Sequence, residues 1–314
     1  MVKELKGCAM TTLHLDEFWP RAGHWLEAGQ NIDTSTKTDL TVIGIGAHLT
    51  SITPTGADKT PEAIRKAMYS YSTYSWAHNL DIANLSVRDA GDIPDPDWDE
   101  GEARVFAQMN ELRDKQKLLV ALGGDNAITY SVGKGLWDSD IDKAGLITID
   151  AHHDIREGVS NGSPVRRLIA AGLQGTHIVQ IGISDYANSP EYARRVKEYG
   201  ITVITRAEMR KRSLEDIMDQ AISIAGASRG PIHYDLDVDV CDRAVTPACP
   251  AATPGGLSAD EVRELTFLAT SHASVTSMDI TEIDATIDSA DERTIRLGAL
   301  CVLEAAAGVA SRSN

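Results

Sequence analysis

Short apolar runs rich in β-branched residues recur along this 314-residue chain, and each is followed by a stretch with helical periodicity. Such alternation is typical of a mostly parallel sheet whose strands are joined by helices that cover both of its faces. We therefore predict an α/β fold with three layers, α/β/α, around a mostly parallel central sheet. The runs are Thr41–Gly46, Lys117–Leu122, Gly145–Ile149, His177–Ile181, Ile201–Ile204, Pro231–Leu236 and Val275–Met278.

Several helix starts are marked by capping residues. Thr60-Pro61 and Ser189-Pro190 each place a hydroxyl at the expected N-cap and proline at the first helical position. The segment Ser258-Ala259-Asp260-Glu261 has the pattern of a capping box. Because no proline- or glycine-rich linker divides the chain, we predict a single domain over residues 1–314, with an N-terminal arm over residues 1–37.

The formal net charge of −16 at pH 7 argues against two classes of partner. Nucleic acid and anionic membrane surfaces both attract basic patches, so we expect neither as a partner. The cysteines Cys8, Cys241, Cys249 and Cys301 form no C-x-x-C pair and no small disulfide framework, which favours a reducing compartment. The first residues have no signal-peptide core, and we predict a cytoplasmic protein.

Polar segments follow three of the predicted strands, at the edge where ligands bind in open parallel sheets. Within one segment, Asp150, His152 and Asp154 alternate, so in an extended chain their side chains leave the same face. Asp237 and Asp239 repeat this pattern in another. The segments are Gly123-Gly124-Asp125-Asn126, Asp150-Ala151-His152-His153-Asp154 and Asp237-Val238-Asp239-Val240-Cys241-Asp242.

So many carboxylates in one crevice would repel each other strongly unless cations lay among them. Taken alone, the D-x-H-x-D string could be loop polarity and capping, and the D-x-D string could be a calcium-like or solvated turn. Together, each after an apolar strand, they favour a dinuclear metal site. Carboxylates with one imidazole suit a hard or borderline divalent ion such as Mn²⁺ better than a metal that prefers thiolates.

These segments resemble the signature segments of the ureohydrolase superfamily, which includes arginases, agmatinases and formimidoylglutamases. The resemblance covers nearly the whole chain and implies an arginase-like fold. Within the superfamily the chain is most similar to formimidoylglutamases. The superfamily segments are Asp150–Asp154, Asp237–Asp242 with Pro247–Gly256 behind it, and Met278–Asp284; the formimidoylglutamase-like stretches are Gly56–Arg65, Asp150–Arg156, Ser160–Pro164 and Pro247–Pro250.

The resemblance implies two Mn²⁺ ions per chain. Asp150 and Asp237 would bridge them, Asp154 would complete one, and His152 with Asp239 would complete the other. Ions roughly 3.5–4 Å apart can share a water and lower its pKa toward neutrality, which would make hydroxide available to attack an amidine carbon. Asp150 and His152 are therefore expected catalytic residues.

Glu282 is also an expected catalytic residue. The family pattern implies that its carboxylate holds the cationic amidinium of the substrate by charge-assisted hydrogen bonds. The alternative is a buried carboxylate paired with a structural cation.

Two positions depart from the superfamily pattern. Most ureohydrolases have a histidine ligand where this chain has Asn126, whose carbonyl is a weaker ligand, so we expect the ion next to it to be held less tightly. Asn161, in Asn161-Gly162-Ser163-Pro164, stands where arginases and agmatinases have a catalytic histidine. Formimidoylglutamases also lack that histidine, and we expect Asn161 to contact substrate, although it could be an ordinary Asn-Gly turn.

The resemblance implies a substrate, N-formimidoyl-L-glutamate, whose carboxylates must be balanced. Arg156 directly follows the metal segment and is the candidate carboxylate clamp, because a guanidinium fork matches a carboxylate bidentately. Arg166 and Arg167 lie just beyond the Asn-Gly turn. The alternative for Arg156 is a salt bridge to a neighbouring surface acid.

The leading hypothesis is therefore hydrolysis of N-formimidoyl-L-glutamate to L-glutamate and formamide. The alternatives are a guanidino hydrolase that releases urea and a catalytically silent superfamily member, the latter suggested by Asn126. Relatives are commonly trimers or hexamers, so we expect a homo-oligomer. The last predicted helix, Glu292–Ala310, is apolar enough to be buried.

Overall fold

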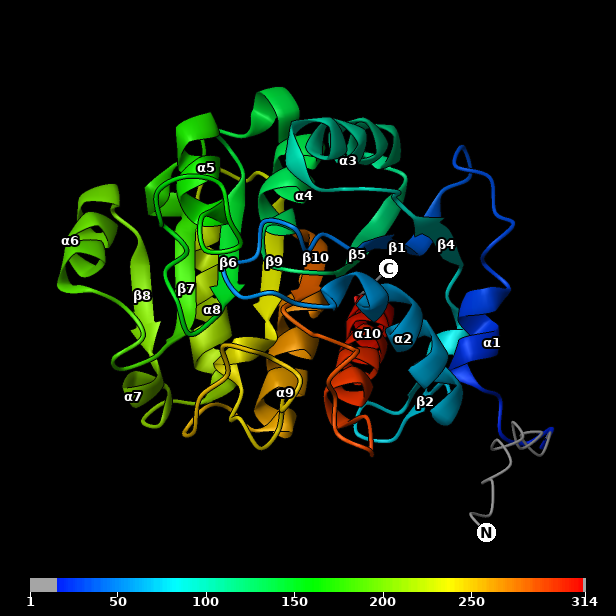
Figure 1. Ribbon diagram of the computed structural model, residues 1–314. Helices are drawn as coiled ribbons and strands as arrows, with labels where there is room; N and C mark the ends of the chain where they lie inside the picture. The colour runs from blue at the N-terminus through cyan, green and yellow to red at the C-terminus, as the bar shows by residue number, and fades with distance from the viewer. Residues whose placement is uncertain (1–15, 313–314) are drawn as a thin grey trace, which may run out of the picture.

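The computed structural model describes residues 16–312, in which an eight-stranded sheet lies between two layers of helices (Figure 1). The strand order is β4-β1-β5-β10-β9-β6-β7-β8, and every neighbouring pair is parallel. The predicted three-layer α/β fold is therefore confirmed. The strands are β1 (Thr38–Ile45), β4 (Val87–Asp92), β5 (Gln116–Gly123), β6 (Gly145–Ile149), β7 (Ile178–Ile183), β8 (Thr202–Thr205), β9 (Ile232–Asp237) and β10 (Val275–Thr281).

Every apolar run that was predicted as a strand overlaps a strand of this sheet, and no predicted end lies more than one residue outside it. The inner strands β6 and β7 are buried along their whole length, which explains their nearly continuous apolar sequence. Strand β9 is equally buried but also carries His233 and Asp235. Strand β4 was missed because it lies at the sheet edge and carries charged residues, which edge strands tolerate. There Arg65 pairs with Asp89 and Asp92. A small hairpin of β2 (Tyr74–Ser75) and β3 (Leu80–Asp81) was also missed.

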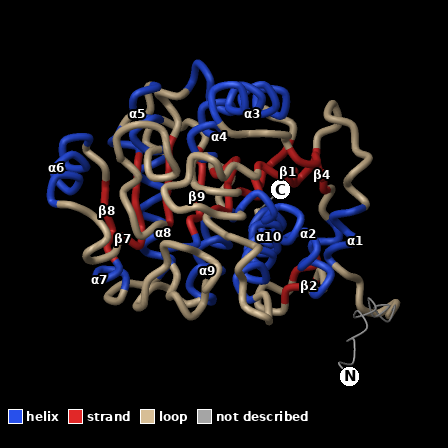
Figure 2. The backbone as a smooth tube through the Cα atoms, viewed as in Figure 1, coloured by secondary structure: helices blue, strands red, loops and turns tan. Residues whose placement is uncertain are grey.

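Helices cover both faces of the sheet (Figure 2), as their packing into separate hydrophobic clusters shows. One layer holds α3 (Trp98–Leu112), α4 (Ile128–Trp137), α5 (Pro164–Ala171) and α6 (Pro190–Tyr199). The other holds α1 (Ala22–Glu27), α2 (Thr60–Ala67), α8 (Leu214–Ala225), α9 (Ala259–Ser271) and α10 (Arg293–Ser311), and the short α7 (Arg206–Met209) follows β8.

Helix α10 is the one helix of residues 16–312 that is long and apolar enough to cross a membrane. It packs closely against α9 and α2, and most of its side chains are buried. Its apolar sequence is therefore explained by its place in the core, and the prediction of a buried closing helix is confirmed.

Two of the three predicted helix caps are present. Ser189 accepts a hydrogen bond from the Tyr192 amide, and Ser258 forms a capping box with Glu261. The prediction for Thr60 was wrong, because a 3₁₀ turn over Ala57–Lys59 leads directly into α2. Thr60 is thus already helical, and its hydroxyl donates to the carbonyl of Ile283.

Part of the predicted N-terminal arm is built into the fold. Within residues 1–37, helix α1 packs against the turn at 68–70, and Arg21 forms a bridge with Ser72. The start of the arm, including Cys8, lies outside the described residues. Because all the strands of the eight-stranded sheet are parallel, their carboxyl ends meet at one edge, and this edge carries the polar segments.

Candidate metal centre and active site

The polar segments converge because their strands are neighbours. Strands β5, β10, β9 and β6 are adjacent in that order. The three polar segments lie at the carboxyl ends of β5, β9 and β6, and Glu282 directly follows β10. Their side chains line a cavity of about 150 Å³. Its lining consists of Ile52, Thr53, His152, Asp154, Arg156, Asn161, Gly162, Asp237, Asp239, Pro250, Ala251 and Glu282.

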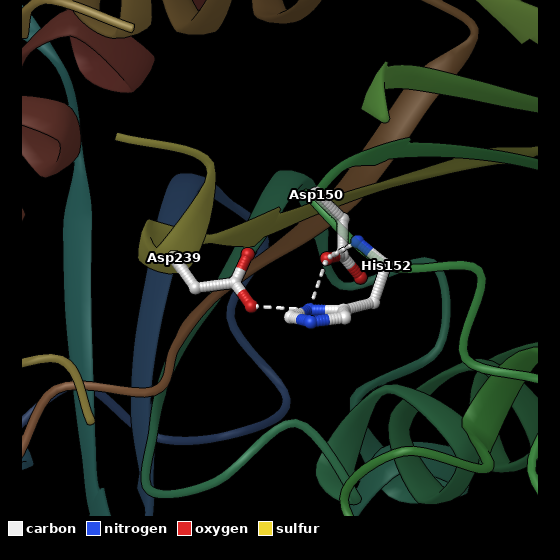
Figure 3. Close-up of side chains that lie close together, drawn as sticks. All are labelled: Asp150, His152 and Asp239. Carbon is white, nitrogen blue, oxygen red and sulfur yellow. Dashed lines mark hydrogen bonds and ion pairs between the residues drawn. The ribbon is translucent and has the colours of Figure 1, made fainter. Parts of the chain in front are cut away.

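Asp150, His152 and Asp239 point toward one another at the centre of this edge (Figure 3). Nδ1 of His152 lies 2.6 Å from Oδ2 of Asp239 and 3.7 Å from Oδ1 of Asp150. The other oxygen of Asp239 accepts a hydrogen bond from the Ala151 amide at 3.0 Å. Ligand atoms of the three side chains are close enough to hold one metal ion.

Burial and mutual repulsion dominate the electrostatics of the site. Burial, helped by the charge of Asp239, raises the pKa of Asp150 to about 7. Burial followed by neighbouring carboxylates also raises the pKa values of Asp154 and Asp237 well above the usual range. Burial opposes protonation of His152, but hydrogen bonds and attraction from Asp150 and Asp239 outweigh it and raise its pKa to about 11.

These residues fit a divalent metal site. Oδ2 of Asp150 is buried and has no hydrogen-bond partner among residues 16–312. Buried carboxylates without a partner are costly, and a cation among them removes that cost. Carboxylate oxygens with one imidazole nitrogen are the ligands expected for a hard or borderline ion.

Asp154 and Glu282 both adopt left-handed backbone conformations, with φ of 51° and 66°. Such conformations are uncommon outside glycine and often mark functional sites. The prediction that an extended chain directs Asp154 to the same face as Asp150 and His152 is therefore wrong. Its side chain reaches the cavity through this turn and not through an extended chain.

Asn126 lies next to the site with its amide nitrogen toward the carboxylates. Nδ2 donates to Oδ2 of Asp154 at 2.6 Å. Its carbonyl oxygen, the expected metal ligand, instead accepts hydrogen bonds from the hydroxyls of Thr129 and Thr281 at 3.0 and 2.9 Å. In this arrangement Asn126 orients Asp154 and offers no oxygen to the cavity.

Asn161 holds Glu282 in place. Nδ2 of Asn161 donates to Oε1 of Glu282 at 2.9 Å, and the Asn126 amide donates to the same oxygen at 2.8 Å. Burial, together with the charge of Asp125, raises the pKa of Glu282 to about 8 despite these bonds. Among residues 16–312 no hydrogen bond reaches Oε2, so this oxygen is available to a ligand.

Sequence reasoning missed the wall formed by the loop after β1. Ile52 and Thr53 line the cavity, and Oδ1 of Asn161 accepts a hydrogen bond from the Ile52 amide at 3.1 Å. The hydroxyl of Ser51 donates to buried Asp125 at 2.7 Å. Asp125 stood within a polar segment and could have been singled out, whereas nothing in the sequence marked the loop.

The arginase family model matches residues 38–308. A formimidoylglutamase from Halalkalibacterium halodurans is 36% identical over 256 residues, which are 79% of this chain and 80% of the relative. The structure of formimidoylglutamase from Bacillus subtilis superposes with a TM-score of 0.88 at 27% identity, covering 99% of this chain and 98% of that one. A formiminoglutamase from Trypanosoma cruzi, solved with manganese, has the same fold, with a TM-score of 0.85 at 23% identity over 94% of this chain and 100% of that one.

The raised pKa values predict that the metal-free protein loses stability as the pH rises. In the unfolded chain these carboxyls ionise near pH 4, so above that pH the unfolded state holds fewer protons than the folded state. The raised pKa of His152 acts in the same direction above its ordinary value of 6.5. A divalent cation such as Mn²⁺ would replace these protons on binding, so its stabilising effect should be larger at pH 8 than at pH 6.

Thermal unfolding with and without Mn²⁺ at both pH values measures this effect. Asp150→Asn is the control, and in this variant the stability of the metal-free protein should depend less on pH. An equal gain from metal at pH 6 and pH 8 would contradict the electrostatic account.

Proposed function

The chain belongs to the arginase family, and on that basis we propose that it hydrolyses N-formimidoyl-L-glutamate to L-glutamate and formamide. The observation that carries this assignment is the charge pattern of the cavity. Its lining includes a carboxylate, Glu282, which suits a cationic amidine, and an arginine, Arg156, which suits an anionic end. The similarity to formimidoylglutamases over most of the chain supports the same substrate.

We assign the metal site to Asp150, His152, Asp154, Asp237 and Asp239. Manganese, with two ions per chain, is supported by the ligand chemistry and by the manganese in the structurally similar Trypanosoma cruzi protein. When bound, such ions lower the pKa of water and supply hydroxide near neutral pH. His152 must be neutral to act as a ligand, so metal binding releases its proton.

Glu282 orients the amidine. With Oε1 held by Asn161 and the Asn126 amide, Oε2 can accept a charge-assisted hydrogen bond from an amidinium N–H. This fixes the amidine carbon toward the carboxylate cluster, where water oxygen forms a bond to that carbon. The water gives up a proton, the bond from carbon to the glutamate nitrogen breaks, and that nitrogen takes up the proton as formamide leaves.

The three arginines near the site differ in whether their guanidinium groups are free to bind a substrate carboxylate. Arg167 is paired with Glu102 by two hydrogen bonds of 2.6 and 2.7 Å, and Arg166 binds the backbone carbonyls of Arg156 and Gly158. The guanidinium of Arg156 is exposed, lines the cavity and forms no ion pair within residues 16–312. Arg156 is therefore the arginine that can bind a substrate carboxylate.

The proposal includes a reducing, cytoplasmic location. Cys241, Cys249 and Cys301 are free and buried, which agrees with a protein that relies on no disulfide among these residues. Assembly into a homo-oligomer stays a prediction.

Product analysis separates the candidate reactions. After manganese loading, N-formimidoyl-L-glutamate should yield equal amounts of glutamate and formamide, while agmatine, arginine and guanidinobutyrate should yield little urea. Both products are measured in parallel on the same preparation. Urea release without formamide would assign the chain to guanidino hydrolysis, and no hydrolysis at any manganese concentration would favour a silent family member.

Replacing Arg156 by Ala should raise KM for N-formimidoyl-L-glutamate by roughly tenfold or more, because charge-assisted hydrogen bonds contribute about 1.5–3 kcal/mol. Steady-state kinetics measure the change, and metal content should stay as in the wild type. Arg156→Lys should recover part of the loss, and Arg167→Ala is a nearby control that should leave KM unchanged. An unchanged KM in Arg156→Ala would remove this residue from substrate binding.

Asn126 should make one of the two ions easier to lose. Its amide nitrogen, and not its carbonyl oxygen, faces Asp154. The ion expected beside Asp154 therefore has no ligand from Asn126. Dialysis against chelator, followed by metal analysis over time, should show one Mn²⁺ leaving well before the other. Loss of both ions at the same rate would show that Asn126 does not weaken either position.

A further inference from the structure

Arg206 is a buried arginine beside the candidate metal centre and is only 7% exposed. It is the first residue of α7, where Thr205 and Glu208 form a capping box. Its side chain donates to three backbone carbonyls: Nε to Gly182 at 3.1 Å, and Nη2 to Val240 at 2.9 Å and Asp239 at 3.3 Å. Within residues 16–312 it forms no ion pair with a carboxylate.

A buried guanidinium without a paired carboxylate is costly unless its surroundings compensate. Burial lowers the pKa of Arg206, and the charges of Asp239 and Asp150 oppose this effect. The arginine therefore lies within the field of the acidic site while its hydrogen bonds go to the backbone. Its position suggests a role in holding that backbone.

The carbonyls that Arg206 joins come from two strands that are not neighbours. Gly182 belongs to β7, whereas Asp239 and Val240 lie in the 3₁₀ turn Val238–Val240 after β9. Strand β6, which leads to Asp150, lies between β7 and β9. The guanidinium therefore ties together the two segments that flank Asp150.

Close packing reinforces this connection. Gly182 has φ of +100°, and a Cβ there would lie only 2.4 Å from Cγ2 of Val240 and 3.3 Å from the carbonyl oxygen of Asp150. The Asp150 amide donates to the carbonyl of Ile181 at 3.0 Å. The backbone of Asp150 and the side chain of Val240 are thus packed against the end of β7.

We propose that Arg206 is a positioning residue that fixes the peptide carrying Asp239, so that the carboxylate of Asp239 meets His152 and the metal in a fixed geometry. The inference rests on the metal centre assigned under the proposed function. Partners of this kind, which orient ligands without touching the metal, typically change metal affinity by about 10–100-fold when removed.

The charge and the positioning of Arg206 have opposite effects on metal binding. A positive charge near the site repels Mn²⁺, so if charge alone mattered, removing it would tighten binding. If positioning matters more, removing the guanidinium frees Asp239 and weakens binding. The direction of the change therefore distinguishes the two roles.

The test measures the affinity of metal-free protein for Mn²⁺ alone, by competition with a chelator of known affinity. Arg206→Met should weaken binding by about tenfold or more, against the direction expected for loss of charge. Arg206→Lys keeps the charge but lacks the fork, so its affinity should also fall below that of the wild type. The lysine variant still tests the inference if the methionine variant does not fold.

Arg312 provides a matched control. Its guanidinium also donates to three backbone carbonyls, those of Thr270, Lys117 and Val275, at 2.8, 3.1 and 2.8 Å. Lys117 and Val275 lie at the amino ends of β5 and β10, at the sheet edge opposite the candidate site. Arg312→Met should lower the melting temperature while leaving Mn²⁺ affinity unchanged.

Unchanged or tighter Mn²⁺ binding in both Arg206 variants would overturn the inference and leave Arg206 a residue of the fold alone. Wild-type affinity in Arg206→Lys would overturn it as well, because the charge alone would then suffice. These outcomes are separate from the proposed reaction, since wild-type protein that binds Mn²⁺ but hydrolyses no amidine would defeat only the assigned activity.

Discussion

Repulsion among carboxylates that share one edge of the sheet is the constraint on which the site depends. Asp150, Asp154, Asp237 and Glu282 are nearly inaccessible to water, and all have raised pKa values. Three neighbouring strands, β10, β9 and β6, bring them together. The fold tolerates them because polar groups compensate part of their negative charge. His152 pairs with Asp239, and amide hydrogens of Asn126 and Asn161 reach Asp154 and Glu282. A divalent cation would compensate the remaining negative charge.

The parallel sheet produces this crowding directly. Parallel strands need crossover helices, so both faces are buried and the strands themselves are apolar. Functional groups are left to the loops at the carboxyl ends, and here four of these loops meet above adjacent strands. The same geometry places the exposed guanidinium of Arg156 on the rim of an otherwise acidic cavity.

Features of the fold and the site that are set by the local sequence were predictable, whereas features set by tertiary packing were not. The inner strands β6 and β7 were predictable because burial on both faces favours continuous apolar runs, whereas β4 carries Arg88, Asp89 and Asp92 and ends in exposed residues. Asp150 and Asp237 were recognisable because they stand at strand ends. The orientation of Asn126 was not, because it depends on hydroxyls of Thr129 and Thr281 that tertiary packing supplies. Arg206 carried no local signal, since its acceptors lie on other strands.

Gly182 shows how the packing around the acidic site restricts which residues the sequence can accept. Gly182 has no side chain that could bind metal or substrate, yet Val240 and the Asp150 carbonyl leave no room for a side chain there. Even alanine would have to displace one of the two segments that carry the acids. Relatives that keep this arrangement of acids should therefore also keep glycine at this position, although no chemical step requires it. Conservation of this glycine would reflect close packing and not a role in the reaction.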